Sequence, residues 1–574
     1  MAQIQQQVIS LDGGLVLNKD TFTQPTGSAL QLQNFEPSIK GGYRRMAGTN
    51  KYVLKEFNDT NLGTTSKTGS DELLMTVILG NDVIVARGAV VGKATSTFLT
   101  ITHTDAVTTF TVNDTSGFAS SGTLFIKSEQ VAYTGKTATT FTGVSRAQGG
   151  TSAAEYVKND IISTNWTKID EARTSAEKYT YARYNFNGTD KICIVDGVNP
   201  PASYDGTTYT LLNSTGFPTT IDSVAVHRNH MFFAKSTSQE LTFSAPFNEN
   251  DFTVANGAGS INVNDTIVAI RGFRDRLFIF CTDSIYALQG TSAADFVVVP
   301  VTTKIGCRDK HSVQEVAGDL IYLAPDGLRT IAGTTKIGDV ELGTVSKAIQ
   351  ERIDALSFDN ISSVTVREKS QYRLFFPKAV GGETNQLGVV GTIKEGQQGG
   401  IGYQWGDIKG LKPSCADSFY IGAIEVVVHG GYDGFVYQQE NGNTFDGTNI
   451  KSFYRSPDII IGDAGVRKNF QRLISNYTTE GTLSAELRVR YDFDDFRVPQ
   501  PAVYNITEGA GAATYGAATT AYGTAMYGSS GTPLIRQPIE GSGFAVAIKI
   551  DEDTGSAPFV LNGFQLEFTP GVQR

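Results

Sequence analysis

The sequence has few of the residues from which catalytic sites and nucleic-acid-binding surfaces are usually built. Its 574 residues include five histidines, four cysteines and two tryptophans, and 48 basic residues stand against 58 acidic ones. A net charge of −10 leaves the chain as a whole without a basic footprint for holding DNA, so tight DNA binding is disfavoured. Transient contact with DNA that slides past remains compatible with this charge.

Membrane and redox signals are also missing. No stretch of 18 apolar residues occurs, and the first residues, Met1–Gln7, lack the basic and apolar segments of a signal peptide. The cysteines have no Cys-x-x-Cys spacing, and two of them, Cys193 and Cys281, lie in apolar runs. We expect a soluble protein made in the cytoplasm, with buried, reduced thiols and no membrane span.

What the sequence does have is a recurring strand, polar turn and second strand, in a composition rich in glycine, threonine and aromatic residues. The clearest units turn at Arg228-Asn229, Asp283-Ser284 and Asp326-Gly327. Units of roughly 40 to 50 residues built from short strands are typical of propeller blades, since one small sheet cannot bury both faces alone. Six units are visible after residue 165, and residues 73–85 form a possible seventh or a strand that closes the ring.

This pattern predicts an all-β chain with a β-propeller core, an inserted small β module and a C-terminal β domain. One helix is expected over 343–353, where Val345, Ile349 and Ile353 recur every four residues. The predicted organisation is an N-terminal arm with the first platform strands (1–94), the inserted module (95–163), the blades (164–455) and the C-terminal domain (456–574). Paired glycines in the arm indicate edge strands that lie across another surface, and residues 510–531 form a glycine-, alanine- and tyrosine-rich loop.

A search for chemistry finds no His-Glu-x-x-His motif, phosphate-binding loop or nucleophile elbow. His227 and His230 stand too close to a turn to indicate a metal site. Aspartates in or beside the turns leave open a glycosidase-like propeller, but turn aspartates usually cap their own backbone. These aspartates are Asp275, Asp283, Asp319, Asp326 and Asp433. We therefore predict no catalytic residue, no cofactor and no metal.

Two sets of short motifs resemble structural proteins of tailed bacteriophages. In the inserted module they are Gly122–Ile126, Val131–Gly135 and Phe141–Arg146. At the amino terminus, Gly13-Gly14 and Gly41–Arg45 are similar to the opening of tail tubular or nozzle proteins of short-tailed phages. The blade series also resembles that family, in Ala182–Gly188, Tyr204–Gly206, Asp326–Leu328 and, near the end of the chain, Pro570–Val572.

The resemblance implies a homo-oligomeric ring of six copies in the virion tail, below portal and adaptor, that extends the DNA channel, retains the genome and permits its ejection. Its implied partners are the adaptor or head-to-tail connector, tail fibres and other tail proteins, and translocating DNA. Gate candidates are the loop-like Gly381, Gly382, Tyr515, Tyr522 and Tyr527, and Arg44 and Arg45 are either partner contacts or a solvated turn. The alternatives are a carbohydrate-active or receptor-binding propeller, or another virion part such as a baseplate or fibre-base protein.

Overall fold

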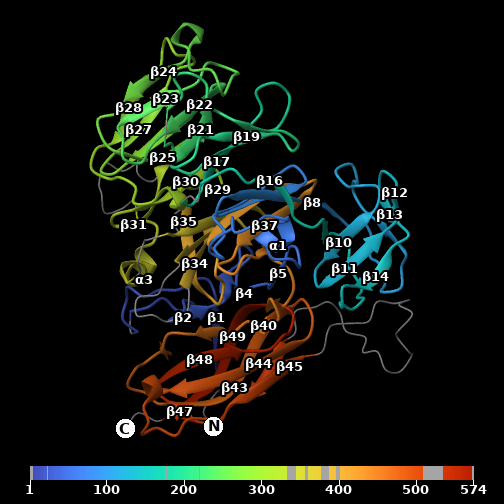
Figure 1. The fold of residues 1–574 in the computed structure, drawn as a ribbon. Helices are drawn as coiled ribbons and strands as arrows, with labels where there is room; N and C mark the ends of the chain where they lie inside the picture. Colours follow the sequence, from blue (N-terminus) through green and yellow to red (C-terminus); the bar gives the residue numbers. More distant parts are fainter. Residues whose placement is uncertain are drawn as a thin grey trace.

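The molecule is all-β, as predicted: 50 % of the chain is strand and 5 % is helical (Figure 1). The computed structural model describes residues 4–21, 23–174, 177–218, 220–332, 344–355, 360–376, 387–395, 401–508 and 534–571. Its helices are short, and none in these ranges is long and apolar enough to span a membrane. They are α1 Asp59–Leu62, η1 Val254–Asn256, η2 Lys310–Ser312, η4 Lys347–Ile349, α3 Gln350–Asp354, η5 Arg367–Lys369 and η6 Asp492–Asp494. The helix expected over 343–353 is thus η4 followed by α3, the described part beginning at residue 344.

Seven groups of antiparallel strands follow one another through the middle of the chain. Group 1 consists of β6 Met75–Leu79, β7 Asp82–Arg87, β8 Val90–Phe98 and β16 Thr167–Asp170. Group 2 consists of β17 Thr180–Tyr184, β18 Lys191–Val195, β19 Ala202–Tyr204 and β20 Tyr209–Leu211. Group 3 consists of β21 Ser223–His227, β22 His230–Ala234, β23 Glu240–Phe243 and β24 Gly259–Asn262. Group 4 consists of β25 Ile267–Phe273, β26 Arg276–Cys281, β27 Ile285–Gln289 and β28 Val297–Thr302. Group 5 consists of β29 Gln314–Val316, β30 Asp319–Ala324 and β31 Gly327–Thr330. Group 6 consists of β32 Ser362–Val366, β33 Gln371–Phe376, β34 Leu387–Glu395 and β35 Ile401–Lys409. Group 7 consists of β36 Cys415–Ile421, β37 Ile424–Gly430, β38 Val436–Gln439 and, from the N-terminal region, β5 Thr49–Lys51.

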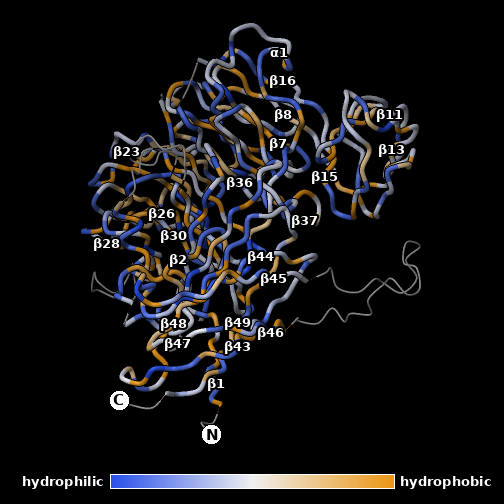
Figure 2. The backbone as a smooth tube through the Cα atoms, turned by 90° about the horizontal axis from the view of Figure 1, so that it is seen from below, coloured by the Kyte–Doolittle hydropathy of each residue, from blue (hydrophilic) through white to orange (hydrophobic). Residues whose placement is uncertain are grey.

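The strands of these groups are apolar on both faces because each group lies between two others. In β26, Leu277 and Ile279 belong to the hydrophobic cluster shared with group 3, whereas Phe278 and Phe280 belong to the cluster shared with group 5. Successive side chains of a strand point to opposite faces, so a strand buried on both faces reads as a continuous apolar run. Figure 2 shows hydrophobic segments running through β26 and β30.

The packing forms a closed series. A hydrophobic cluster joins each group to the next, and one further cluster, with Val83, Val85, Val426 and Val428, joins group 7 back to group 1. First strands also touch directly, as β36 does with β6 and with β32. The predicted hairpins are confirmed, with positive φ at Arg228 and Asn229 in the turn between β21 and β22.

Between β8 and β16 the chain leaves group 1 and builds a small module with its own core (Figure 1, right). Its strands are β9 Thr109–Thr111, β10 Gly122–Ile126, β11 Glu129–Tyr133, β12 Gly135–Lys136, β13 Thr140–Thr142, β14 Ser145–Gln148 and β15 Ile161–Ser163. The module returns beside its point of departure, because Ile161 of β15 pairs with Phe98 at the end of β8.

The C-terminal strands pack below the seven groups (Figure 1). They are β41 Ser452–Arg455, β42 Ile459–Ile460, β43 Lys468–Thr479, β44 Leu483–Tyr491, β45 Tyr504–Glu508, β46 Leu534–Pro538, β47 Ser542–Gly543, β48 Ala545–Glu552 and β49 Phe559–Pro570, while β39 Thr444–Phe445 and β40 Thr448–Asn449 extend group 7. The N-terminal strands join them: β1 Gln5–Ser10, β2 Gln31–Gln33, β3 Phe35–Pro37 and β4 Tyr43–Arg45.

The N-terminal arm is therefore built into sheets, whereas the sequence placed it across another surface. Strand β2 pairs with β35 on one side and β41 on the other, and so makes group 6 and the C-terminal strands one ten-stranded sheet. Strands β1 and β4 pair with β49, and β5 adds a fourth strand to group 7. Leu32 and Phe35 are completely buried at this seam because it lies between two bodies of sheet.

Candidate functional sites

Arg44 and Arg45, the candidates for a partner contact, both bind within the chain. Arg45 is fully buried and its Nε lies 2.9 Å from Oε2 of Glu552, which is equally buried. Arg44 forms ion pairs with Glu36 at 3.0 Å and Glu480 at 2.7 Å. Arg45 is thus neither a solvated turn residue nor a surface contact, and Arg44 keeps only a small exposed part.

Arg44 belongs to a buried network of charges at the seam. Arg373 of β33 lies 3.0 Å from Glu36 and also pairs with Glu440, and Lys369 bonds to both of these carboxylates. Burial alone would raise the pKa of Glu440, but Lys369 and Arg373 outweigh it and hold that pKa well below its usual value. The network ties the N-terminal strands to groups 6 and 7 through paired charges, although Nε of Arg373 has no hydrogen-bond partner.

The gate candidates Gly381, Gly382, Tyr515, Tyr522 and Tyr527 lie outside the described residues. Among the other residues that sequence singled out, Nε2 of His227 is buried without a hydrogen-bond partner. His227 and His230 are register partners across one hairpin, and Nδ1 of His230 lies 2.6 Å from the carbonyl oxygen of Ser244. All four cysteines are free thiols and buried, as predicted.

Most of the turn aspartates bond to neighbouring backbone or side chains. Asp326 pairs with Arg329, Asp433 accepts a hydrogen bond from Tyr437, and Asp319 accepts from the backbone of Leu320. Asp275 and Asp319 do line one groove of about 550 Å³. Asp319 also accepts from the backbone of Ala332, and Asp275 lies 3.5 Å from Arg228.

A second pair of carboxylates lies on the ten-stranded sheet, in a groove of about 760 Å³. Glu486 of β44 and Asp551 of β48 are register partners, and burial, reinforced by Glu486, raises the pKa of Asp551. The guanidinium of Arg488 lies 2.7 Å from Glu486 and 3.0 Å from Asp551, so it bridges the two carboxylates and offsets part of their charge. An acid and base pair needs one proton-carrying and one free carboxyl group, which this bridge disfavours.

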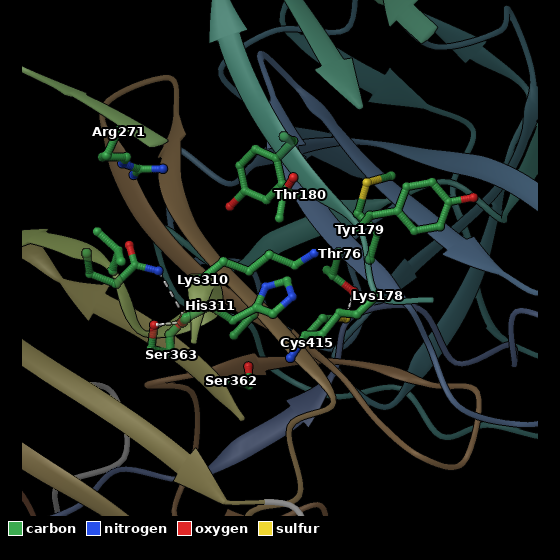
Figure 3. Close-up of a pocket in the computed structure, with 15 residues that line it drawn as sticks. Thr76, Lys178, Tyr179, Thr180, Arg271, Lys310, His311, Ser362, Ser363 and Cys415 are labelled. Carbon is green, nitrogen blue, oxygen red and sulfur yellow. Dashed lines mark hydrogen bonds between the residues drawn. The ribbon is translucent and has the colours of Figure 1, made fainter. Parts of the chain in front are cut away.

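The most unusual chemistry lies in a cavity of about 80 Å³ where several of the strand groups meet. Its lining comes from six of the seven groups, near the starts of β6, β17, β29, β32 and β36 and from the middle of β25. Three cations, Lys178, Arg271 and Lys310, belong to this lining together with His311, and none of the lining residues is a carboxylate. Figure 3 shows these side chains entering the cavity from different elements.

The cations differ in how they are balanced. Lys310 lies 3.1 Å from the carboxylate of Asp222, and Nζ of Lys178 donates to the carbonyl oxygen of Ile361 at 2.6 Å. Burial lowers the pKa of Lys178 to about 8 and also lowers the pKa of Arg271. His311 is held neutral because burial, with the nearby lysines, lowers its pKa well below its ordinary value.

Sequence reasoning missed this cavity because its residues are spread from Met75 to Ala416. One signal was present: Arg271 is a charged residue inside an otherwise apolar strand, Ile267–Phe273. A charge in a strand buried on both faces points either to a buried ion pair or to a polar cavity.

No protein-family model matches the sequence, and no curated protein matches it significantly. Solved structures with some likeness include two extracellular domains from B. thetaiotaomicron. One belongs to a putative hybrid two component system, with a TM-score of 0.31 and 8 % identity over 69 % of this chain and 40 % of that chain. The other belongs to a putative one component system, with a TM-score of 0.32 and 10 % identity over 73 % of this chain and 43 % of that chain. A third is Sqt1 of Saccharomyces cerevisiae (TM-score 0.25, 8 % identity, 45 % and 94 %). This chain spans about two fifths of the length of each bacterial domain. At these TM-scores the likeness supports neither a shared fold nor a shared function.

Proposed function

We propose that the seven strand groups are the blades of a β-propeller. Three observations support this: each group shares a hydrophobic cluster with the next, the seventh shares one with the first, and first strands converge on a central cavity. Strand β5 comes from the N-terminal region and completes the last blade, which ties the beginning of the chain to the end of the ring. Sequence counted six blades after residue 165, and residues 73–85 lie in the additional one.

On this scaffold we propose a structural role in a bacteriophage tail, as a ring of six copies that forms the nozzle. The observation that carries the structural role is the ten-stranded sheet, in which β2 makes group 6 and the C-terminal strands one continuous body. A wall that retains a packaged genome has to resist deformation, and backbone pairing through a buried strand supplies that stiffness. The assignment to a phage tail rests on the sequence motifs.

The charges of the molecule fit a conduit. A net charge of −10 disfavours tight DNA binding and is compatible with transient contacts to DNA that passes through the ring. Several of the carboxylates that a carbohydrate-active propeller could use are engaged by backbone amides or by arginine, as Asp319 and Asp551 show. In the proposed virion, the ring contacts the adaptor, other tail proteins and tail fibres.

An exposed aromatic surface on the C-terminal strands is suited to subunit contact. Phe496 exposes 89 % of its surface, and Phe493 and Phe544 expose about two fifths of theirs. The segments that carry Phe493 and Phe544 are joined by a hydrogen bond from the backbone of Phe544 to the carboxylate of Asp492. Aromatic side chains are enriched where proteins associate, since they bury much apolar area for little entropy.

The test is whether the purified full-length chain forms rings, observed by native mass spectrometry and negative-stain electron microscopy. We expect closed rings of six copies, and we expect Phe496→Ser to weaken them. Val254→Ser is the matched control, because Val254 is 77 % exposed but lies on η1, in group 3. A strictly monomeric chain at high concentration, with no ring in virions that carry it, would contradict the proposal.

A carbohydrate-active or receptor-binding propeller, and a baseplate or fibre-base protein, are separated from this proposal by two further observations. Turnover of a host polysaccharide that is lost in Glu486→Gln or Asp551→Asn would favour the first. Immunogold labelling of virions at the baseplate or fibre base, away from the tail axis, would favour the second.

A further inference from the structure

The cavity where the strand groups converge has a charge opposite to that of the chain. Lys178, Arg271 and Lys310 line it, and no carboxylate does among its lining residues, although the sequence has ten more acidic than basic residues. Burying a charge without a partner is costly, so unpaired cations in a small interior space need a compensating anion.

Two of the three cations have no such partner within the described part of the chain. Nζ of Lys178 bonds to a carbonyl oxygen alone, and the side chain of Arg271 forms no ion pair or hydrogen bond within the described residues. Two carboxylates behind the lining are already engaged: Asp222 bonds to Lys310 and Ser236, and Asp417 bonds to Arg183, Tyr181 and the backbone of Ile78. Glu315 acts on Arg271, and Asp309 and Glu72 act on Lys178, through charge alone, without an ion pair. The guanidinium of Arg271 therefore brings donors to the cavity lining that no carboxylate of the described residues uses.

A second and independent observation points to a ligand. Ser362 at the start of β32 lines the same cavity and is 2 % exposed, yet its Oγ has no hydrogen-bond partner. Buried hydroxyl groups are nearly always satisfied, because an unsatisfied one forfeits its hydrogen bonds to water. Figure 3 shows Ser362 below His311, close to the side chain of Lys178.

We propose that this cavity binds a small oxyanion, a carboxylate or a phosphate. Arg271 supplies a planar fork of donors, Lys178 and Lys310 supply further charge, and Ser362 donates its hydroxyl hydrogen. The volume of about 80 Å³ admits an ion of this size and excludes a nucleotide or an oligosaccharide. The site lies within one chain, so it does not depend on the proposed ring.

Isothermal titration of the full-length protein with inorganic phosphate, and separately with acetate, tests the proposal, with sodium chloride holding the ionic strength constant. We expect saturable binding of at least one of the two anions. Arg271→Gln and Lys178→Met should each weaken it about tenfold or more, since a charge-assisted hydrogen bond is lost. Arg276→Gln is the matched control, because Arg276 is exposed at the start of β26, in the same hairpin.

Thermal unfolding separates a binding defect from a folding defect. Without added anion, Arg271→Gln should unfold at the same temperature as the wild type or higher, because it removes a partly buried cation that has no ion pair. With phosphate or acetate, the wild type and Arg276→Gln should gain stability and Arg271→Gln should not. Equal gains in all three proteins, or no saturable binding of either anion, would overturn the proposal.

Discussion

Arg45 and Glu552 are 507 positions apart in the sequence, and their side chains form a 2.9 Å ion pair from which solvent is fully excluded. Arg45 also donates hydrogen bonds to the carbonyl oxygens of Asn443 and Thr554, so its guanidinium joins β4, the end of β48 and the segment before β39. The contact fixes the N-terminal strands against the C-terminal sheet, at the seam that also contains β2.

Removing one member of this pair should be strongly destabilising, because the other is left charged and buried. We expect Glu552→Gln or Arg45→Met to cost about 3 to 5 kcal/mol, which thermal and urea-induced unfolding would measure. Arg497→Gln is the control: its pair with Asp495 is 77 % exposed on the arginine side, and a loss of about 0 to 1 kcal/mol is expected there. A loss equal to that of the control would show that the seam does not depend on this pair.

The close approach of the N-terminal segment to β35 gives a second prediction. A Cβ added at Gly406 would lie 2.6 Å from the carbonyl oxygen of Phe35, whereas one at Gly402 in the same strand would meet nothing nearer than 3.8 Å. Gly406→Ala should push β3 away and cost about 1 to 3 kcal/mol, and Gly402→Ala should have little effect. Limited proteolysis should cleave the first 50 residues faster in Gly406→Ala alone, and equal cleavage in both variants would contradict this account.

His429 gives a prediction about pH. Its ring is buried and stacked on Tyr437, with centroids 5.2 Å apart, and burial lowers its pKa to about 3. In the unfolded chain His429 has the ordinary pKa of about 6.5, so below that pH the unfolded chain binds a proton at this residue and the folded chain does not. The penalty is absent above pH 6.5 and grows as the pH falls from 6.5 towards 3, at about 1.4 kcal/mol per pH unit.

Unfolding at a series of pH values checks this. His429→Gln should flatten the pH dependence between 6.5 and 4 by one proton, whatever its effect at pH 7.5. Burial also lowers the pKa of His103, His227 and His311, so the His429→Gln variant should retain part of the slope. An unchanged slope in the variant would mean that His429 is protonated in the folded state.

Sequence predicted the parts of this structure that depend on neighbouring residues. Apolar runs such as Leu277–Cys281, and turns such as Arg228-Asn229, identify hairpins because strand alternation and turn conformation are local properties. The N-terminal arm could not be placed in this way: β2 has three residues, and it is a strand only because β35 and β41 flank it. The ion pair of Arg45 and the cation-lined cavity depend likewise on residues hundreds of positions apart.

The inserted module offers a test of the boundary predicted at 95–163. Phe98 and Ile161 are register partners, so a two-residue turn of Asn-Gly replacing residues 99–160 can join β8 directly to β15. The module has its own core, which includes Phe110, Phe141 and Tyr156, but Phe125 packs into the cluster between groups 1 and 7. We therefore expect the shortened chain to fold, to keep its cooperative thermal transition, and to lose about 2 to 4 kcal/mol from the missing phenylalanine.

A matched variant tests whether the loss of stability in the shortened chain comes from the missing side chain of Phe125. Phe125→Ala in the full-length chain should lower stability by a similar amount, because it empties the same position in the cluster while the module stays in place. Shortened chains that aggregate, while Phe125→Ala remains folded, would show that strands β9 to β14 are needed to form group 1. In that case the module is an integral part of the sheet that begins with β6, as the continuous pairing from β14 through β15 and β8 to β6 permits.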